Sequence, residues 1–393
     1  MLPLLAVLPA LAQAANLKVY ILAGQSNAVG MAEVHSLNKS SPGGKIPMNG
    51  TLSWQLTDPR TAAQFAPLWD KPNADPSGNW TVLRPVNMWY NEVGQLGKDG
   101  TMLNGSKIPG KNGVDACFGP LSVGYGAGCG ANDYNNIGPE LGFGFGMQEE
   151  NGRISETPIL IMKNAWGGKT LCGDFRPPTS TTTADPYCTS GDCCTAEGHY
   201  YSVMMANVAK MMAPGSIETM FPHLAGMTPV ISGFGWWQGW NDGCDLNCTA
   251  AYEQNLVNLI ADVRTAWKSP ALPVSIATAG FLSPAESAKE ETSRAPKGCW
   301  RKDGIGGKLK CNCANDHGCR RLDVVLSQID ATDPKKHPEL GGHAVTVDQR
   351  PYHREAQYSP NHGQGYHYWH NAETYYLTGL AMANGMKEAD AAL

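Results

Sequence analysis

The first segment with chemical potential is Gly24-Gln25-Ser26-Asn27, which directly follows the apolar run Lys18–Ala23. In open parallel sheets, ligands bind beyond the carboxyl ends of the strands. A serine on a tight strand-to-helix turn is exposed as a nucleophile, and backbone N–H groups of the following helix can stabilise an oxyanion. A serine there can equally well cap the helix. This fragment alone supports both interpretations of Ser26.

A second segment, Gly235-Trp236-Trp237-Gln238-Gly239-Trp240-Asn241-Asp242, follows the apolar run Val230–Phe234. Gln238 is a neutral amide donor, the type of group that stabilises a developing oxyanion. Asn241 and Asp242 are placed to orient it or to bind a substrate. The alternative is an aromatic-lined loop whose polar residues only form a turn.

A third segment, Gly365-Tyr366-His367-Tyr368-Trp369-His370-Asn371, precedes the last helical pattern of the chain. Either histidine could be a general base, because imidazole titrates near neutral pH. A lone histidine is more often structural. Two of them in a loop of Gly, Tyr and Trp at a helix start favour a catalytic role.

Taken together in order, these motifs resemble the sialate O-acetylesterase-like branch of the SGNH (GDSL-type) hydrolases. The motifs are GQSN at 24–27, IGPELGFG at 137–144, WWQGWND at 236–242 and a histidine before the closing helix. The resemblance extends over about residues 18–386. It implies a flavodoxin-like, three-layer α/β/α sandwich and a serine nucleophile with a histidine base. It also implies cleavage of an acyl ester, usually acetyl, on a carbohydrate.

The resemblance assigns Ser26 as the nucleophile and His367 as its base. It assigns the oxyanion to the Ser26 N–H, the Gly138 N–H and the side-chain amide of Gln238. Other SGNH enzymes use asparagine where this chain has Gln238, and both residues are primary-amide donors.

One departure from the family pattern concerns the acid that orients the base, which the family places three residues before the histidine. Gln364 stands there for His367, and His367 itself stands there for His370. We prefer His367, because 365–368 matches the family's stretch, and keep His370 as the alternative base. The base would then be oriented by a backbone carbonyl or by an acid from another loop, for which Asp348 is a guess.

Substrate contacts are expected at the same edge of the sheet. The segment Lys163–Lys169 follows the apolar run Ile159–Met162, and 174–176 lies just downstream. Tryptophans there would form platforms for a sugar ring, and cationic side chains would bind hydroxyls or an acidic sugar. Core packing is an equal alternative for the tryptophans, Trp166 included. The expected contacts are Asn27, Lys169, Arg176, Trp237, Trp240, Asn241 and Asp242.

The elements that must position these residues alternate between short apolar runs and helical patterns, which indicates a parallel sheet covered on both faces. The predicted strands are Lys18–Ala23, Ile159–Met162, Val230–Phe234, Val274–Thr278 and Ala344–Val347. The predicted helices are Pro139–Glu149, Tyr200–Met212, Tyr252–Trp267 and Ala372–Met386. Segments near 35–135 and 283–321 lack this periodicity. We interpret both as loop insertions on a single domain that spans 15–393.

Composition narrows the class. Thirty Lys and Arg against 35 Asp and Glu leave a net charge of −5, which argues against nucleic-acid binding. Residues 1–14 are apolar and end near a small-x-small site, so we predict a signal peptide and no stable membrane anchor. Twelve cysteines in polar stretches and five N-x-[ST] sequons fit a secreted, disulfide-bonded glycoprotein. The sequons start at Asn38, Asn49, Asn79, Asn104 and Asn247.

No cofactor or metal is expected. Cys311, Cys313, His317 and Cys319 have ligand types that zinc accepts, but disulfides are the preferred interpretation in a secreted chain. The predicted function is therefore a secreted serine esterase that removes O-acetyl groups from a carbohydrate, with an acetylated carbohydrate as its partner. The alternative is an inactive relative that binds glycans, which the missing acid favours and the intact Ser26, Gly138 and Gln238 set disfavours.

Overall fold

The fold is described from a computed structural model. The described residues are 15–37, 45–46, 48–70, 79–91, 117–127, 135–181, 197–279, 300–302, 309–311 and 321–392. The predicted signal peptide at 1–14 lies outside them. Most of the predicted insertion at 283–321 also does, including Cys313, His317 and Cys319.

A seven-stranded sheet runs through the described part of the molecule in the order β15-β12-β11-β1-β10-β5-β6. All neighbouring strands are parallel except β5 and β6, which are antiparallel. The strands are β1 (Asn16–Gly24), β5 (Leu83–Tyr90), β6 (Cys117–Leu121), β10 (Ile159–Ala165), β11 (Thr228–Trp237), β12 (Val274–Ala277) and β15 (Ala344–Val347). The central position of β1 places the residues that follow it between two neighbouring strand ends.

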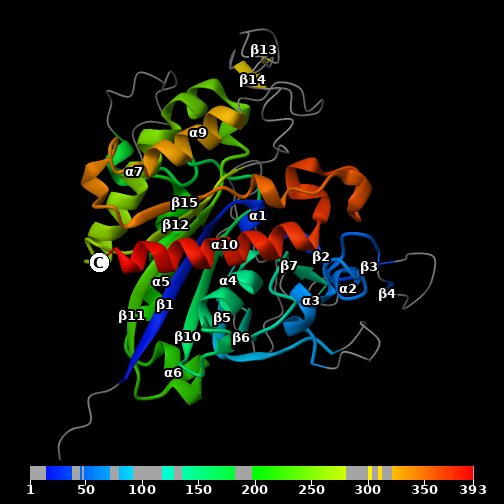
Figure 1. The fold of residues 1–393 in the computed structure, drawn as a ribbon. Coiled ribbons are helices and arrows are strands. Elements are labelled where there is room, and N and C mark those ends of the chain that lie inside the picture. Colours follow the sequence, from blue (N-terminus) through cyan, green and yellow to red (C-terminus); the bar gives the residue numbers. More distant parts are fainter. Residues whose placement is uncertain are drawn as a thin grey trace, which may run out of the picture.

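Helices cover both faces of this sheet (Figure 1). On one face lie α4 (Pro139–Gln148) and α10 (Ala372–Ala391), and α10, in red, crosses in front of the strands. On the other face lie α5 (His199–Met212) and α7 (Leu246–Ala266), with α9 (Arg321–Ala331) against α7.

Strand β11 shows why the sequence produces two covered faces. Its glycines face α10, where a Cβ on Gly235 would lie 3.1 Å from the end of Met382. Its alternate residue Trp236 faces α7 and donates from its indole nitrogen to the Tyr252 hydroxyl at 3.4 Å. Successive side chains of a strand point to opposite faces, so small residues admit one helix closely while aromatic residues fill the space under the other.

The remaining elements are short. Helices α1 (Ser26–Val29), α2 (Leu52–Gln55), α3 (Ala62–Phe65) and α6 (Ser216–Met220) occur in the connections. Two-stranded pairs join β2 (Ala32–Glu33) to β7 (Asn136–Ile137), β3 (Ser36–Leu37) to β4 (Lys45–Ile46), β8 (Glu149–Glu150) to β9 (Arg153–Ile154) and β13 (Trp300–Lys302) to β14 (Leu309–Cys311). A distorted 3-10 segment, Gly365–His370, leads into α10.

The predicted α/β class is confirmed, and each of the five predicted strands belongs to the sheet. The interpretation of 35–135 as loop insertion is wrong in part, because β5 and β6 come from this stretch. The sequence of β5, LRPVNMWY, contains Arg, Pro and Asn and has no clear period. It becomes a strand by pairing with β10, and β6 closes that edge of the sheet.

The disulfide prediction is confirmed where cysteines are described. Cys172 and Cys248 form a disulfide, and Cys117 and Cys244 are also disulfide-bonded. Cys311 lies in β14, and its side chain is outside the described part. Within the described ranges, none of the helices combines the length and apolar character that crossing a bilayer requires.

Candidate active site

Ser26 is the first residue of α1, directly beyond the carboxyl end of β1, and is 6% exposed. The turn before it requires glycine: Gly24 has φ +147°, and a Cβ there would lie 2.1 Å from the carbonyl oxygen of Trp237. Backbone bonds pin the turn to both neighbouring strand ends. The Gln25 N–H donates to Trp237 O at 3.3 Å, and the Trp166 N–H donates to Gly24 O at 3.2 Å. The three predicted strand-end segments therefore meet around Ser26.

The loop that carries His367 is attached to this turn through Asn27. The Asn27 side-chain amide donates to the Tyr366 carbonyl at 3.1 Å. The hydroxyl of Tyr375 on α10 donates to Asn27 Oδ1 at 2.5 Å and to the His367 carbonyl at 3.3 Å. Asn27, the residue after Ser26, is thus a clamp between the nucleophile turn and the Tyr366 carbonyl directly before His367.

The backbone of this loop is strained. Tyr368, Trp369 and His370 have φ values of 49°, 54° and 59°, a left-handed conformation that residues with side chains rarely adopt. Tyr368 is fully buried and stacks on Trp237 with 5.5 Å between ring centroids. Packing of this kind holds the loop in an otherwise unfavourable shape.

Gln364 lies between the two histidine rings. Its Oε1 is 3.1 Å from His367 Nδ1 and 2.6 Å from His370 Nε2. The other nitrogen of His370, Nδ1, is 3.1 Å from Glu33 Oε1. Burial, and then the charge of His370, lower the pKa of His367 to about 4.

The guess that Asp348 orients the base finds no support in the described contacts. Its carboxylate accepts from Arg350 at 2.7 and 2.8 Å and from the Thr278 hydroxyl at 3.4 Å. No hydrogen bond joins Asp348 to His367 or His370 among the residues that the structure describes.

Gln238 is engaged on both ends of its amide. Its Nε2 is 2.5 Å from Asp242 Oδ2, 2.9 Å from Lys169 O and 3.3 Å from Gln25 Oε1. Its Oε1 accepts from the Tyr252 hydroxyl at 3.0 Å. At 1% exposure, this side chain ties three loops together, which favours a supporting role over direct contact with an oxyanion.

Asn241 is oriented differently. Its Oδ1 accepts from Gln25 Nε2 at 2.9 Å, and Gln25 Oε1 in turn accepts from the Gly239 N–H at 3.1 Å. Asn241 is only partly buried, and its Nδ2 has no hydrogen-bond partner within the described ranges. Since Gln25 is the neighbour of Ser26, Asn241 presents an available amide donor next to the nucleophile turn.

Gly138 approaches the nucleophile helix because β2 pairs with β7. A Cβ on Gly30, which has φ +99°, would lie 2.4 Å from Gly138 Cα. The Gly138 N–H donates to Glu140 Oε1 at 2.8 Å, and Lys163 Nζ lies 3.1 Å from Glu140 Oε2. Lys163 also donates to Val29 O at 2.8 Å. Burial raises the pKa of Glu140, and the charge of Lys163 opposes that shift.

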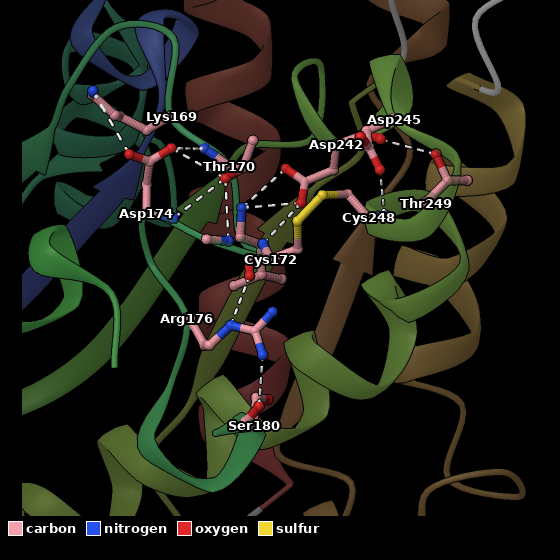
Figure 2. Close-up of a disulfide and its surroundings, with 12 residues drawn as sticks. Lys169, Thr170, Cys172, Asp174, Arg176, Ser180, Asp242, Asp245, Cys248 and Thr249 are labelled. Carbon is pink, nitrogen blue, oxygen red and sulfur yellow. Dashed lines mark hydrogen bonds and ion pairs between the residues drawn. A yellow bond between two sulfur atoms is a disulfide. The ribbon is translucent and has the colours of Figure 1, made fainter. Parts of the chain in front are cut away.

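Asp242 is fully buried beside the Cys172–Cys248 disulfide (Figure 2). It accepts from the backbone N–H groups of Leu171 at 2.9 Å and Cys172 at 3.0 Å. Burial raises its pKa to about 7, although these bonds favour the carboxylate. Cys172, Asp242 and Cys248 have ligand atoms within 4.8 Å of one another, but both sulfurs are taken by the disulfide and are not thiolate ligands.

The other expected substrate residues divide into packed and accessible groups. Arg176 is 3% exposed and donates to the carbonyls of Cys172 and Ser180 (Figure 2), which favours a structural role. Trp166, Trp237 and Trp240 are at most 7% exposed, in agreement with the core-packing alternative. Lys169 keeps a partly accessible ammonium, 3.7 Å from Asp174 Oδ1.

Tyr366, which is not among the substrate contacts expected from the sequence, is an exposed aromatic side chain of the site. It is 39% exposed and its ring centroid lies 4.5 Å from that of His367. The buried Trp240 packs behind it at 5.8 Å. Its position next to the candidate base in the motif was the available signal.

Comparison with known proteins supports the resemblance. The family described as "Carbohydrate esterase, sialic acid-specific acetylesterase" matches residues 118–299. Members of such a family are hydrolases of ester bonds. The matched stretch contains Gly138 and the 236–242 segment, while Ser26 and His367 lie outside it. No curated protein sequence is similar enough to count as a match.

Solved structures that match this chain share little sequence with it. A protein from Arabidopsis thaliana has 12% identity and a TM-score of 0.44, covering 94% of this chain and 97% of its own. A carbohydrate acetylesterase from Xanthomonas citri has 13% identity and a TM-score of 0.32, covering 70% of this chain and 47% of its own. NanS has 13% identity and a TM-score of 0.32, covering 67% and 68%.

Proposed function

We propose that this chain is a secreted serine esterase that removes O-acetyl groups from a carbohydrate. The observation that carries the proposal is the Asn27 clamp, which attaches the loop of His367 to the turn of Ser26. Asn27 reaches the Tyr366 carbonyl at 3.1 Å, and Tyr375 bridges Asn27 and the His367 carbonyl. This attachment of two segments from opposite ends of the chain supports the assignment of Ser26 as nucleophile and His367 as base, which acyl transfer needs at one sheet edge.

In this mechanism, His367 Nε2 takes the proton of the Ser26 hydroxyl as Oγ attacks the acetyl carbonyl. The tetrahedral intermediate collapses when His367 returns the proton to the departing sugar oxygen, leaving an acetyl ester on Ser26. Water then attacks this ester with the same assistance from His367. The products are acetate, the free sugar hydroxyl and regenerated Ser26.

The oxyanion would be held by the Ser26 N–H at the start of α1 and by a side-chain amide. We assign that amide to Asn241 in place of Gln238, because the amide of Gln238 is already occupied by Asp242, Lys169 O and Gln25. Gly138 contributes as a shared donor, since its N–H also bonds Glu140. Donors set in place before the reaction stabilise the developing charge without reorganisation.

The carbohydrate part of the proposal rests on the family match and on Tyr366. An exposed aromatic ring beside the base offers an apolar face for a sugar. The backbone carbonyl of Lys169 accepts from Gln238, and its partly accessible side chain would bind hydroxyls or an acidic group of the sugar. The disulfides and the apolar 1–14 stretch support an oxidising, extracytoplasmic location.

The test is release of acetate from p-nitrophenyl acetate and from acetylated xylan. Ser26→Ala should abolish turnover on both substrates while its unfolding transition stays that of the wild type. Ser216→Ala, at the start of α6, is the matched control and should retain full activity. Wild-type protein that releases no acetate yet binds the acetylated polysaccharide would support the glycan-binding alternative and overturn the esterase proposal.

A further inference from the structure

A chain of side-chain contacts runs from β2 to His367 in the loop before α10. Glu33, His370 and Gln364 follow one another to His367 by contacts of 3.1, 2.6 and 3.1 Å. Glu33 is on β2, 337 residues from His370 in sequence. The chain ends on Nδ1 of His367, the nitrogen that faces away from the reacting proton when Nε2 is the base.

We propose that Gln364 is the positioning residue of the base, and that the His370–Glu33 pair locks its amide with Oε1 between the two imidazole rings. This inference rests on the proposed function, because it names how the base of that same site is oriented. Gln364 stands three residues before His367, where the resemblance leads one to expect an acid.

The hydrogen-bond chemistry of an amide oxygen supports this assignment. An amide oxygen only accepts, so His367 must carry its proton on Nδ1, which leaves the lone pair on Nε2 for the Ser26 hydroxyl. With the amide reversed, its NH₂ would donate to Nδ1 and place the ring proton on Nε2, the tautomer that cannot act as a base. The orientation of one amide therefore decides whether His367 is competent.

His370 supplies the lock. Its two ring nitrogens face two acceptor oxygens, Gln364 Oε1 and Glu33 Oε1, an arrangement that the doubly protonated ring satisfies completely. A reversed amide would turn its NH₂ toward the ring N–H of His370 and lose the bond. The side chains of His370 and Glu33 are 15% and 22% exposed, so the ion pair is partly shielded from solvent.

The arrangement differs in charge from one with an aspartate. A carboxylate would stabilise the imidazolium that forms on His367. The neutral amide of Gln364, with His370 on its other side, stabilises that imidazolium less. The His367 and His370 rings are 6.0 Å apart, and the charge of His370 contributes to the low pKa of His367. Among the described contacts of His367, the other titratable groups are Tyr366, packed against its ring, and Tyr375, which donates to its carbonyl.

The first experiment compares Gln364→Met with Gln364→Glu, using acetate release as a function of pH. Gln364→Met keeps the size and removes the acceptor, so kcat should fall about 10²-fold or more with KM little changed, because a base held in the wrong tautomer costs up to roughly 10⁴ in rate. Gln364→Glu should restore kcat to within about tenfold and move the acid limb of kcat/KM upward by about one pH unit or more. Gln254→Met, on the exposed side of α7, is the matched control.

The second experiment tests the lock. His370→Phe and Glu33→Gln should each lower kcat about threefold to tenfold. His370→Phe should also move the acid limb of kcat/KM to higher pH, because the charge of His370 contributes to the low pKa of His367. Ring ¹⁵N shifts of His367 should report Nδ1–H in the wild type and a tautomer mixture in Gln364→Met, whether or not a substrate is turned over.

The outcomes separate this proposal from the proposed function. If Gln364→Met keeps kcat within twofold of the wild type, or if its His367 tautomer is unchanged, the positioning role is wrong even when Ser26→Ala is inactive. A wild type without esterase activity that still shows the Gln364-dependent tautomer would refute the function and retain the positioning. Equal losses in Gln364→Met and Gln364→Glu would indicate a purely structural side chain.

Discussion

Lys163 offers a direct test of how the core supports the active site. It is a lysine in the middle of β10 with no exposed side-chain surface, paired with Glu140, whose side chain is 1% exposed. Its ammonium contacts Glu140 Oε2 at 3.1 Å, Val29 O at 2.8 Å and the Tyr125 carbonyl, and lies 4.2 Å from the Tyr90 ring centroid. These contacts join the end of α1 to the start of α4.

We predict that Lys163→Met lowers the free energy of unfolding by about 3–5 kcal/mol, because it leaves a buried carboxylate unpaired. That is a large part of the roughly 5–15 kcal/mol that stabilises a typical domain. Glu140→Gln should cost about 3 kcal/mol, since an amide oxygen can still accept from the Gly138 N–H but the lysine loses its counter-ion.

The double variant Lys163→Met/Glu140→Gln separates the charge effect from packing. With both charges removed, its loss should be smaller than the sum of the single losses by about 2 kcal/mol or more, as expected for a directly coupled pair. Urea unfolding at pH 7, followed by tryptophan fluorescence, measures all three values. Single variants within about 1 kcal/mol of the wild type, or strictly additive losses, would refute the argument that this pair is an electrostatic unit.

Three further predictions concern the site. The pKa of His367, lowered to about 4, implies that kcat/KM rises with pH near 4 and is already level at 6.5. In the unfolded chain His367 has the ordinary histidine pKa of about 6.5, so the unfolded chain binds this proton at a higher pH than the folded protein. The free energy of unfolding should therefore decrease as pH falls from 6.5 toward 4. A rise of kcat/KM centred on pH 6.5 would contradict the lowered pKa on which both expectations depend. Asn241→Ala should lower kcat by roughly 10²–10³ with a small change in KM. It should lower the unfolding midpoint less than Gln238→Ala, because Asn241 accepts one bond from Gln25 whereas the amide of Gln238 makes four. A kcat loss confined to Gln238→Ala would return the oxyanion role to Gln238. Tyr366→Ala should raise KM for acetylated xylan several-fold and leave p-nitrophenyl acetate hydrolysis nearly unchanged, and equal effects on both substrates would exclude a sugar platform.

Much of the architecture followed from local sequence. The run Val19–Ala23 is apolar and buried, and a strand covered on both faces in a parallel sheet requires that pattern. The four predicted helices begin and end within a few residues of their predicted bounds, except that α7 starts six residues earlier and α10 extends five residues further. The GQSN, IGPELGFG and WWQGWND motifs predicted the class of chemistry through their resemblance to a known family, and the position of GQSN after Lys18–Ala23 located Ser26 at a strand end.

Other features depend on residues far apart in the chain. The segment Leu83–Tyr90 has no strand period of its own and becomes β5 only because β10 offers it a partner. The occupied amide of Gln238 follows from a network that brings Gln25, Lys169 and Asp242 together. No local rule reports which donors of a polar motif are already satisfied, since that depends on the acceptors the fold places around them.

The orientation of the base shows this division most clearly. The sequence by itself determined that a histidine precedes the last helix and that no acid stands three residues before His367. Only the tertiary structure placed Gln364 between His367 and His370, and placed Glu33 of β2 behind His370. The physical reason is that hydrogen bonds between side chains act over about 3 Å, while the residues that make them are brought within that range by strand pairing and helix packing.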